Sequence, residues 1–346
     1  MQSYNPAGTD GFDFLEFSTK EPDRLHKQFL SLGFTPVAKH QQHDIIIYQQ
    51  NDIKFIINRA ENSLASQFAF LHGPSTSAMG FRVKDADQAL QHAIMNGAKV
   101  CKEGAYRSPA IYGVGGSIIY FVDYKNNEAN YFKDFSKLSQ THSDAGQAGL
   151  TYLDHVTHNL HRGNMDTWAE FYEKIFNFRE IRYFDIEGKL TGLKSRAMTS
   201  PCGKIRIPLN ESSDDKSQIE EFLKDFNGEG IQHIALGTSE IFNSVEQLKK
   251  QGLEFLETPD TYYELLEKRL PKHGENVDRL RKNRILLDGS MQPEKKLLLQ
   301  IFTKNMLGPV FFEIIQRKGD EGFGEGNFKA LFESIELDQI NRGVLT

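Results

Sequence analysis

The sequence is poor in cysteine and contains no long apolar run. Its 346 residues include only two cysteines, Cys101 and Cys202, which are too few for a disulfide framework and form no C-x-x-C pair. We therefore expect a reducing, cytoplasmic location. No stretch approaches the roughly 20 apolar residues of a membrane-spanning helix, and the N-terminal MQSYNPAGTDGFDF has no basic patch followed by an apolar core. Neither a membrane location nor a secretion signal is expected.

The charge balance argues against nucleic acid as the main partner. The formal net charge of -6 is mild, and no basic stripe with interleaved aromatic residues occurs. A hydrophobic fraction of 39% with 25% charged residues is typical of a globular protein, and the length predicts two domains or one large domain. Tryptophan occurs once, against 26 phenylalanines and 12 tyrosines, which can fill a core or line a pocket for an aromatic small molecule.

Four stretches share one pattern of strand, amphipathic helix, helix-ending residue and further β-rich runs. Their first strands begin at Phe12, Ala78, Tyr152 and Gly230. Each pattern predicts a βαβββ module, and the helices end at Gly33, Gly97, Asn177 and Gly252, which suit a left-handed helix stop. In the second module, Ala89, Leu90, Ala93 and Ile94 are predicted to form the buried helix face.

The modules predict an α+β fold in which two pairs form two domains of curved, open β-barrel-like sheets with outer helices. We expect domains at residues 1–140 and 150–346, joined by the polar, small-residue-rich stretch 136–149. Residues 260–284 predict a charged helical insertion in the fourth module. The tail from Gly322 predicts a Gly-rich turn and a helix with Phe328, Leu331, Phe332 and Ile335 on one face. Such a helix either caps a sheet opening or packs on the surface.

A carboxylate interrupts the apolar run near the C-terminus. Glu313 lies between Phe312 and Ile314, where a buried charge is costly unless a partner or a metal compensates it. Either strand alternation brings Glu313 to the surface, or the interior requires a negative charge there.

Two histidines suggest why the interior would require a negative charge at Glu313. His155 and His233 occupy similar places in the first strands of modules three and four, where modules one and two have Phe14 and Gly80. Two histidines and one carboxylate with open positions form the site of non-haem Fe(II) oxygenases, although a single histidine on an apolar strand is also compatible with a structural role. We expect His158 and His161 either to have structural roles or to support the ligands, and we expect surface positions for His26, His40, His43, His72, His92, His142 and His273.

Ordered sequence runs resemble a known family over nearly the whole chain. The C-terminal runs LDHVTHNL, GLKSRAM, IPLNES, GEGIQHIAL, LLLQIFTKN, FFEIIQRKG and GFGEGNFKALFESIE, with GFDFLEF, AMGFRVKDA and GGSIIYFVD before them, resemble bacterial 4-hydroxyphenylpyruvate dioxygenase. The resemblance implies the vicinal oxygen chelate fold. It makes His155, His233 and Glu313 the ligands of one Fe(II) per chain, and it leaves the N-terminal half, which lacks ligands, a structural role.

The same resemblance implies a reaction and a pocket. The reaction converts 4-hydroxyphenylpyruvate and O2 to homogentisate and CO2 in tyrosine and phenylalanine catabolism, and the substrate supplies its own 2-oxo acid. The implied substrate-binding residues are Ser195, Asn210, Gln218, Gln232, Gln300, Phe302, Phe323, Asn327 and Phe328. Of these, Ser195, Asn210, Gln232, Gln300 and Phe302 are also expected to act in catalysis. The tail is expected to close over the ring, and the protein is expected to be a homodimer or homotetramer.

Three other readings remain open. A 4-hydroxymandelate synthase would use the same substrate and metal but hydroxylate the side chain; the aromatic Phe302 favours ring hydroxylation, because that branch tends to carry a smaller aliphatic residue there. An extradiol ring-cleaving dioxygenase would require further acid/base histidines in the pocket. A metal-free binding protein could use the same modules. The TKNMLGP turn before Glu313 is shorter than in plant members of the family.

Overall fold

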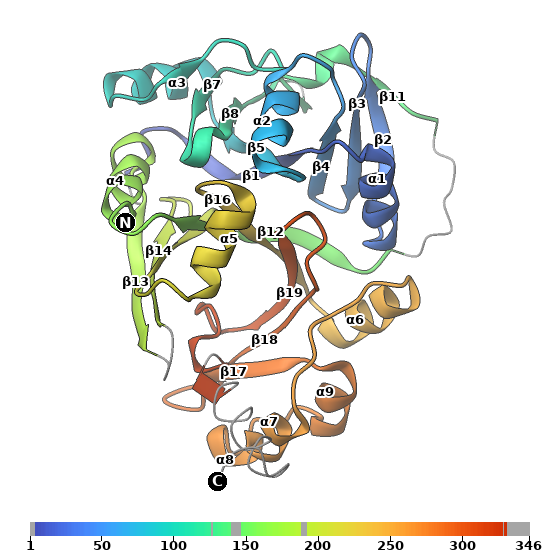
Figure 1. Ribbon diagram of the computed structural model, residues 1–346, viewed down its shortest axis with the longest axis vertical. Helices are drawn as coiled ribbons and strands as arrows, with labels where there is room; N and C mark the ends of the chain where they lie inside the picture. Colours follow the sequence, from blue (N-terminus) through green and yellow to red (C-terminus); the bar gives the residue numbers. More distant parts are fainter. Residues whose placement is uncertain (1–3, 126, 140–146, 188–191, 328, 331–346) are drawn as a thin grey trace.

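Two large curved sheets, one for each half of the chain, form the framework of the protein (Figure 1). The computed structural model describes residues 4–125, 127–139, 147–187, 192–327 and 329–330. Within them, the N-terminal sheet has the strand order β11-β2-β3-β4-β1-β5-β8-β7-β6, and the C-terminal sheet has the order β13-β14-β15-β12-β16-β19-β18-β17. A small hairpin pairs β9 (Tyr124–Lys125) with β10 (Glu128–Ala129).

The N-terminal sheet contains two βαβββ modules. The first module has the elements β1 (Thr9–Ser18), α1 (Pro22–Ser31), β2 (Thr35–His40), β3 (Ile45–Gln50) and β4 (Ile53–Asn58). Helix α2 (Leu64–His72) then leads to the second, which has β5 (Ser75–Val83), α3 (Ala86–Met95), β6 (Val100–Cys101), β7 (Ala110–Tyr112) and β8 (Ile118–Val122). The edge strand β11 (Phe135–Lys137) pairs with β2.

The C-terminal sheet repeats the arrangement. The third module has β12 (Leu150–Leu160), α4 (Met165–Phe176), β13 (Arg179–Glu187), β14 (Gly192–Thr199) and β15 (Arg206–Ser212). Helix α5 (Gln218–Phe226) precedes the fourth, which has β16 (Gly230–Thr238), α6 (Ile241–Lys250), β17 (Leu286–Ser290), β18 (Lys296–Phe302) and β19 (Phe311–Lys318). The predicted helical insertion is confirmed as α7 (Asp260–Glu264), α8 (Leu266–Arg269) and α9 (Val277–Asn283).

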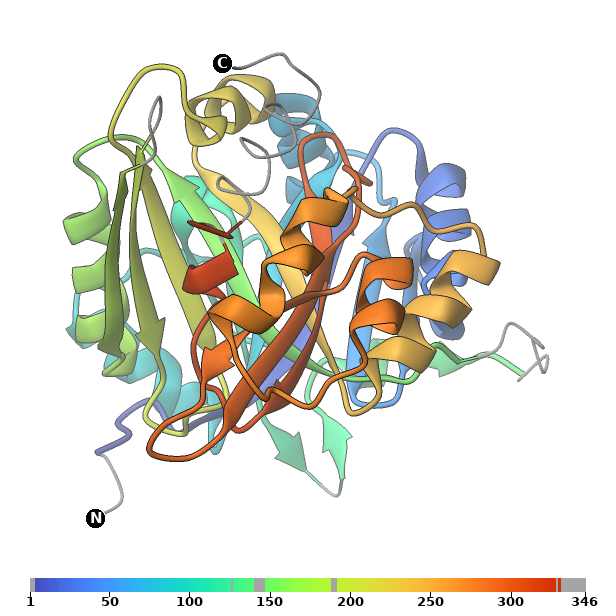
Figure 2. The ribbon, with the colours of Figure 1, turned by 90° about the horizontal axis from the view of Figure 1, so that it is seen from below.

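The register shows how each pair of modules encloses an interior. In each half, the first strands of the two modules pair antiparallel, β1 with β5 and β12 with β16. The last strand of each module then pairs parallel with its own first strand, which curls the sheet on both sides. Figure 2 shows the C-terminal sheet from below: the orange helices of the insertion and the red turn after β19 lie at its open side.

The helix ends are as predicted, but one residue of a predicted helix face is not buried. Gly33, Gly97, Asn177 and Gly252 all have positive φ values, between 55° and 88°, so the left-handed stops are confirmed. Ile94, predicted to be buried, is 42% exposed. Helix α3 buries Ala89 and Ala93, as predicted, together with Ala86, because small side chains let the helix lie close to its sheet.

The two halves pack directly against each other. Phe312 of β19 lies 6.4 Å from Phe17 and 5.9 Å from Phe55, measured between ring centroids. At Gly115, φ is 60° and an added Cβ would lie 1.9 Å from the backbone oxygen of Glu229. Glycine is therefore required where the backbones of the two halves meet.

Several smaller predictions need correction. Ser136 and Lys137, expected in the linker, lie in β11, because the edge of the N-terminal sheet offers them hydrogen-bonding partners. His40 and His273, expected on the surface, are 7% and 1% exposed. Helices α2 and α5 were not predicted. His142 and the tail residues Phe328, Leu331, Phe332 and Ile335 lie outside the described residues.

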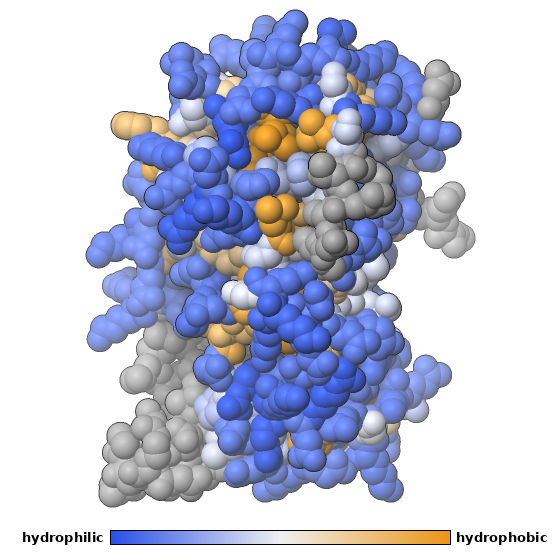
Figure 3. Space-filling view, turned by 90° about the vertical axis from the view of Figure 1, so that its right-hand side faces the viewer, coloured by the Kyte–Doolittle hydropathy of each residue, from blue (hydrophilic) through white to orange (hydrophobic). Residues whose placement is uncertain are grey.

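The face of the molecule shown in Figure 3 is mostly hydrophilic. On the face in Figure 3, apolar residues appear in small separate groups among hydrophilic ones, while most aliphatic and aromatic side chains are buried in the core. Within the described ranges, every helix is too short or too polar to cross a bilayer.

The interior of the N-terminal sheet is filled with aromatic side chains. Phe14 packs there against Tyr106, Tyr120 and Tyr131. Glu16, two residues further along β1, is 2% exposed. Its carboxylate accepts hydrogen bonds from Ser77 Oγ at 2.7 Å, Asn58 Nδ2 at 3.0 Å and the Tyr106 hydroxyl. In this interior, neutral donors surround the Glu16 carboxyl group, whereas the interior of the C-terminal half contains histidines.

Glu16 makes stability depend on pH. Burial raises the pKa of Glu16 above its ordinary value near 4.5, and the hydrogen bonds from Tyr106, Ser77 and Asn58 offset only part of the rise. The folded state thus favours the protonated form, so its contribution to stability is complete below the ordinary pKa and is lost as pH rises through the raised pKa. We expect Glu16→Gln to remove this loss in urea denaturation curves between about pH 4 and 8.

A second variant separates charge from packing. Glu16→Ala leaves three buried donors unpaired and a cavity, so it should lower the free energy of unfolding by about 2–5 kcal/mol. An identical pH profile for the wild type and Glu16→Gln would contradict the assignment.

Candidate metal centre

Three neighbouring strands of the C-terminal sheet bring His155, His233 and Glu313 together. One potential ligand atom from each residue lies within 4.8 Å of the others. Glu313 Oε2 lies 3.2 Å from His155 Nε2 and 3.7 Å from His233 Nε2. The register explains the convergence. His155 and Glu313 both pair with Ala235, from the two sides of β16, and His233 lies two residues before Ala235, where it pairs with Thr157.

The neighbours of the two histidines orient both rings in the same way. His155 Nδ1 donates to Asp154 Oδ1 at 2.8 Å, and His233 Nδ1 donates to Gln232 Oε1 at 2.9 Å. The Nε2 atoms are therefore the ones that face Glu313. Thr157 Oγ1 lies 3.0 Å from His233 Nε2 and borders the same space.

The electrostatics of the three residues fit a divalent cation. The side chains of His155, His233 and Glu313 are 3%, 14% and 2% exposed, and the ion pairs described for Glu313 are with these histidines. Burial alone would lower the pKa of His155, but the Glu313 and Asp154 carboxylates outweigh it and raise that pKa. Burial and the His155 charge hold the pKa of His233 well below its ordinary value. Two imidazole nitrogens and one carboxylate oxygen on one side suit a first-row metal with open positions.

A row of polar side chains crosses the sheet beside the triad. Ser195 of β14 pairs with Asn210 of β15, and Asn210 pairs with Asn159 of β12. Asn210 Nδ2 lies 3.5 Å from Asn159 Oδ1. Asn159, which was not predicted, is fully buried, and its Nδ2 has no hydrogen-bond partner among the described residues. Its period-two spacing from His155 and Thr157 was a usable signal, because alternate residues of a strand share a face.

A second polar chain leads from Glu313 to the tail. Gln300 Nε2 donates to Glu313 Oε1 at 3.3 Å, and Asn327 Nδ2 donates to Gln300 Oε1 at 3.1 Å. The Tyr262 hydroxyl of α7 donates to Asn327 Oδ1 at 2.6 Å. At Gly324, where φ is 79°, an added Cβ would lie 1.7 Å from Gln300 Oε1, so only glycine lets the tail approach this closely.

The aromatic residues expected in the pocket lie next to the histidines. The ring of Phe323 is 5.2 Å from that of His155, and the ring of Phe302 is 6.5 Å from that of His233. Gln218 is exposed at the first position of α5, and no described contact joins it to the triad. Phe328 lies outside the described residues. The substrate roles of all these residues remain predictions.

His158 has the structural position that we expected. It is fully buried, and its Nε2 lies 3.2 Å from the Tyr172 hydroxyl of α4, while its Nδ1 lies 3.3 Å from the Val156 oxygen. It therefore faces the helix layer, opposite to the triad. His161 is exposed.

Comparisons with known proteins agree with this geometry. Residues 3–136 match the family described as hydroxyphenylpyruvate dioxygenase, N-terminal, and residues 152–266 match the glyoxalase/bleomycin resistance protein/dioxygenase superfamily. The chain is 56% identical to hemolysin VllY of Vibrio vulnificus and 55% identical to 4-hydroxyphenylpyruvate dioxygenase of Legionella pneumophila, over 100% of this chain and 99% of each relative. A solved mutant of 4-hydroxymandelate synthase from Streptomyces coelicolor is similar, with a TM-score of 0.79 at 26% identity, covering 96% of this chain and 99% of that one.

Fold and comparisons together define the class as a pair of vicinal oxygen chelate domains, mixed α+β, with curled half-barrel sheets. Within this class, the chain belongs to the 4-hydroxyphenylpyruvate dioxygenase family. The predicted fold class and the resemblance to the bacterial enzymes are confirmed.

Removal of the carboxylate tests the metal site. We expect Glu313→Ala to fold but to bind Fe(II), added without O2, far more weakly than the wild type. The loss should exceed the roughly 10–100-fold that follows removal of a residue that only supports a ligand. Anaerobic isothermal titration measures it, and circular dichroism checks the fold. Glu16→Gln, at a buried carboxylate of the other half, is the matched control, and unchanged Fe(II) affinity in Glu313→Ala would exclude Glu313 as a ligand.

Proposed function

We infer that the protein is an Fe(II)-dependent dioxygenase that converts 4-hydroxyphenylpyruvate and O2 to homogentisate and CO2. The observation that carries this inference is the convergence of His155, His233 and Glu313 in one buried site. Relatives that are 52–55% identical over at least 98% of their length, from Legionella and Pseudomonas, bear the name of this enzyme. We propose one Fe(II) per chain, held by these three residues.

The chain's own residues prepare the site for such a substrate. A bound Fe(II) would supply the centre at which the 2-oxo acid and O2 meet. Asn210 and Ser195 offer an uncharged amide and a hydroxyl on one row of the sheet, and such groups orient a phenol or an oxo acid without competing for the metal. Phe302 and Phe323 lie beside the two histidines and would exclude water from the reacting groups.

Two alternatives can be weighed against particular residues. Similarity to 4-hydroxymandelate synthase makes side-chain hydroxylation the second candidate, but the identity is 26%, against 55% for a dioxygenase relative. An extradiol enzyme requires further histidines in the pocket. His158, which lies three residues from His155, bonds to Tyr172 and Val156 instead.

Location and assembly belong to the same proposal. Cys101 and Cys202 are free thiols, which fits the reducing cytoplasm that we propose. We also propose a homodimer or homotetramer that acts on a small molecule and O2, with no nucleic-acid or membrane partner.

The product of the reaction tests the proposed function. Iron-loaded protein incubated with 4-hydroxyphenylpyruvate should consume O2, release CO2 and yield homogentisate, identified by mass spectrometry and chromatography against both authentic products. Phe302→Leu should shift part of the product towards hydroxymandelate, because it removes the aromatic ring beside His233. Hydroxymandelate as the only wild-type product would favour the alternative, and no O2 uptake would exclude both.

A further inference from the structure

The residue before His155 connects the candidate metal centre to a second buried ion pair. Asp154 Oδ1 accepts the hydrogen bond from His155 Nδ1 at 2.8 Å. The same carboxylate accepts two hydrogen bonds from Arg317, from Nε to Oδ2 at 2.7 Å and from Nη2 to Oδ1 at 2.8 Å. The Asp154 side chain has no exposed surface and that of Arg317 is 7% exposed. A bidentate pair of this kind fixes the carboxylate plane and hence the direction of the third bond, to the imidazole.

Arg317 also holds the start of the tail. Its Nη1 donates to the backbone oxygens of Asp320 at 3.0 Å and Gly322 at 2.7 Å. Its guanidinium carbon lies 5.7 Å from the centre of the Phe323 ring. A guanidinium has five N–H donors, so the Arg317 side chain can bind the Asp154 carboxylate and the backbone of the tail at the same time.

These contacts form a closed circuit. His155 bonds to Asp154, Asp154 pairs with Arg317, Arg317 lies over Phe323, and Phe323 meets His155 edge to face at 5.2 Å. Glu313 and Arg317 are both on β19, so the same strand carries a residue of the triad and the arginine that binds Asp154 and the tail.

We propose that Asp154 and Arg317 are positioning residues: Asp154 holds the His155 ring with Nε2 towards the metal, and Arg317 couples that orientation to the docking of residues 320–323. The proposal rests on the proposed metal site. In this proposal, neither Asp154 nor Arg317 contacts the substrate or the metal. Metal binding and tail docking then stabilise each other, because each requires the same orientation of His155, Asp154 and Arg317.

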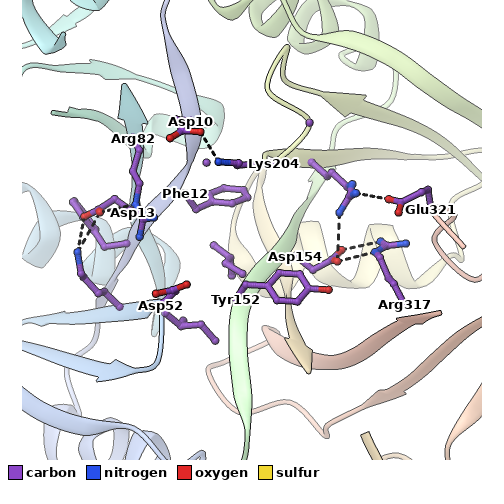
Figure 4. A pocket seen from close by; sticks show the side chains of 17 residues that line it. Asp10, Phe12, Asp13, Asp52, Arg82, Tyr152, Asp154, Lys204, Arg317 and Glu321 are labelled. Atoms are coloured by element: carbon purple, nitrogen blue, oxygen red, sulfur yellow. Dashed lines mark hydrogen bonds and ion pairs between the residues drawn. The ribbon is translucent and has the colours of Figure 1, made fainter. Parts of the chain in front are cut away.

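The internal repeat supplies a control from the same molecule. Asp13 of β1 precedes Phe14, as Asp154 precedes His155. It is also buried, and it accepts hydrogen bonds from Lys54 at 3.2 Å and Arg82 at 3.1 Å. Figure 4 shows Asp13 with Arg82 and Asp154 with Arg317 on opposite sides of a cavity of about 500 Å³ between the halves. An aspartate is thus buried at this place in both halves, but of the two only Asp154 is bonded to an imidazole ring.

Metal affinity separates positioning from simple support of the sheet. We expect Asp154→Asn to weaken binding of Co²⁺, used as an air-stable probe for Fe(II), by about 10–100-fold in isothermal titration, and to change the Co²⁺ absorption bands. Asp13→Asn should lower the melting temperature but leave Co²⁺ affinity within about twofold, since it lies outside the site. Asp154→Asn with wild-type Co²⁺ affinity would overturn the proposal.

Hydrogen exchange tests the coupling between the metal site and the tail. This measurement also tests the proposal if the Asp154→Asn variant does not fold. In the wild type, Co²⁺ should slow amide exchange at residues 320–323. Arg317→Lys keeps a positive charge but loses the bidentate fork, so the slowing by Co²⁺ should disappear. Equal slowing in both proteins would overturn the role of Arg317. A wild type that binds no Co²⁺ or Fe(II) would instead refute the proposed function, and the positioning roles with it.

Discussion

A buried carboxylate must be compensated, and the C-terminal half is arranged around this constraint at Glu313. The residue is 2% exposed on β19, and the basic side chains described next to its carboxylate are the imidazoles of His155 and His233. Both imidazoles turn Nδ1 outwards to a neighbour, which directs Nε2 to the same point. A divalent cation at that point would offset the desolvation of Glu313, and the polar chain through Gln300 and Asn327 then connects the site to the tail and the insertion.

The two halves share one arrangement of strands and helices but fill its interior with different side chains. Where the C-terminal half has His155 and His233, the N-terminal half has Phe14 and Gly80, and the Phe14 ring occupies the space that a side chain at position 80 would need. The Glu16 carboxyl group lies in this interior and is bonded to neutral donors. Phe14 and Gly80 at these places allow aromatic packing, which explains how the same fold provides a site in one half and a packed core in the other.

Much of this could be predicted because it depends on local periodicity. The module pattern, the left-handed helix stops and the matching places of His155 and His233 are properties of short segments, and the register of the sheets then brings Glu313 to them. Burial across elements could not be predicted in the same way. Ile94 is exposed because alanines form the contact face of α3, and His273 is buried although it lies in a charged insertion. Similarly, the bond from Gln232 to His233 and the unpartnered Asn159 depend on rotamers and on neighbouring strands, which no single segment specifies.

The backbone contact between Gly115 and Glu229 has an optical consequence. The Glu229 carboxylate accepts hydrogen bonds from Asn164 Nδ2 at 2.7 Å and from the indole nitrogen of Trp168 at 2.8 Å. Trp168 is the only tryptophan of the chain, so its emission arises from one known place, on α4 and next to the seam between the halves. The protein therefore carries one intrinsic fluorophore, and it is hydrogen-bonded to the residue that meets the N-terminal half at this seam.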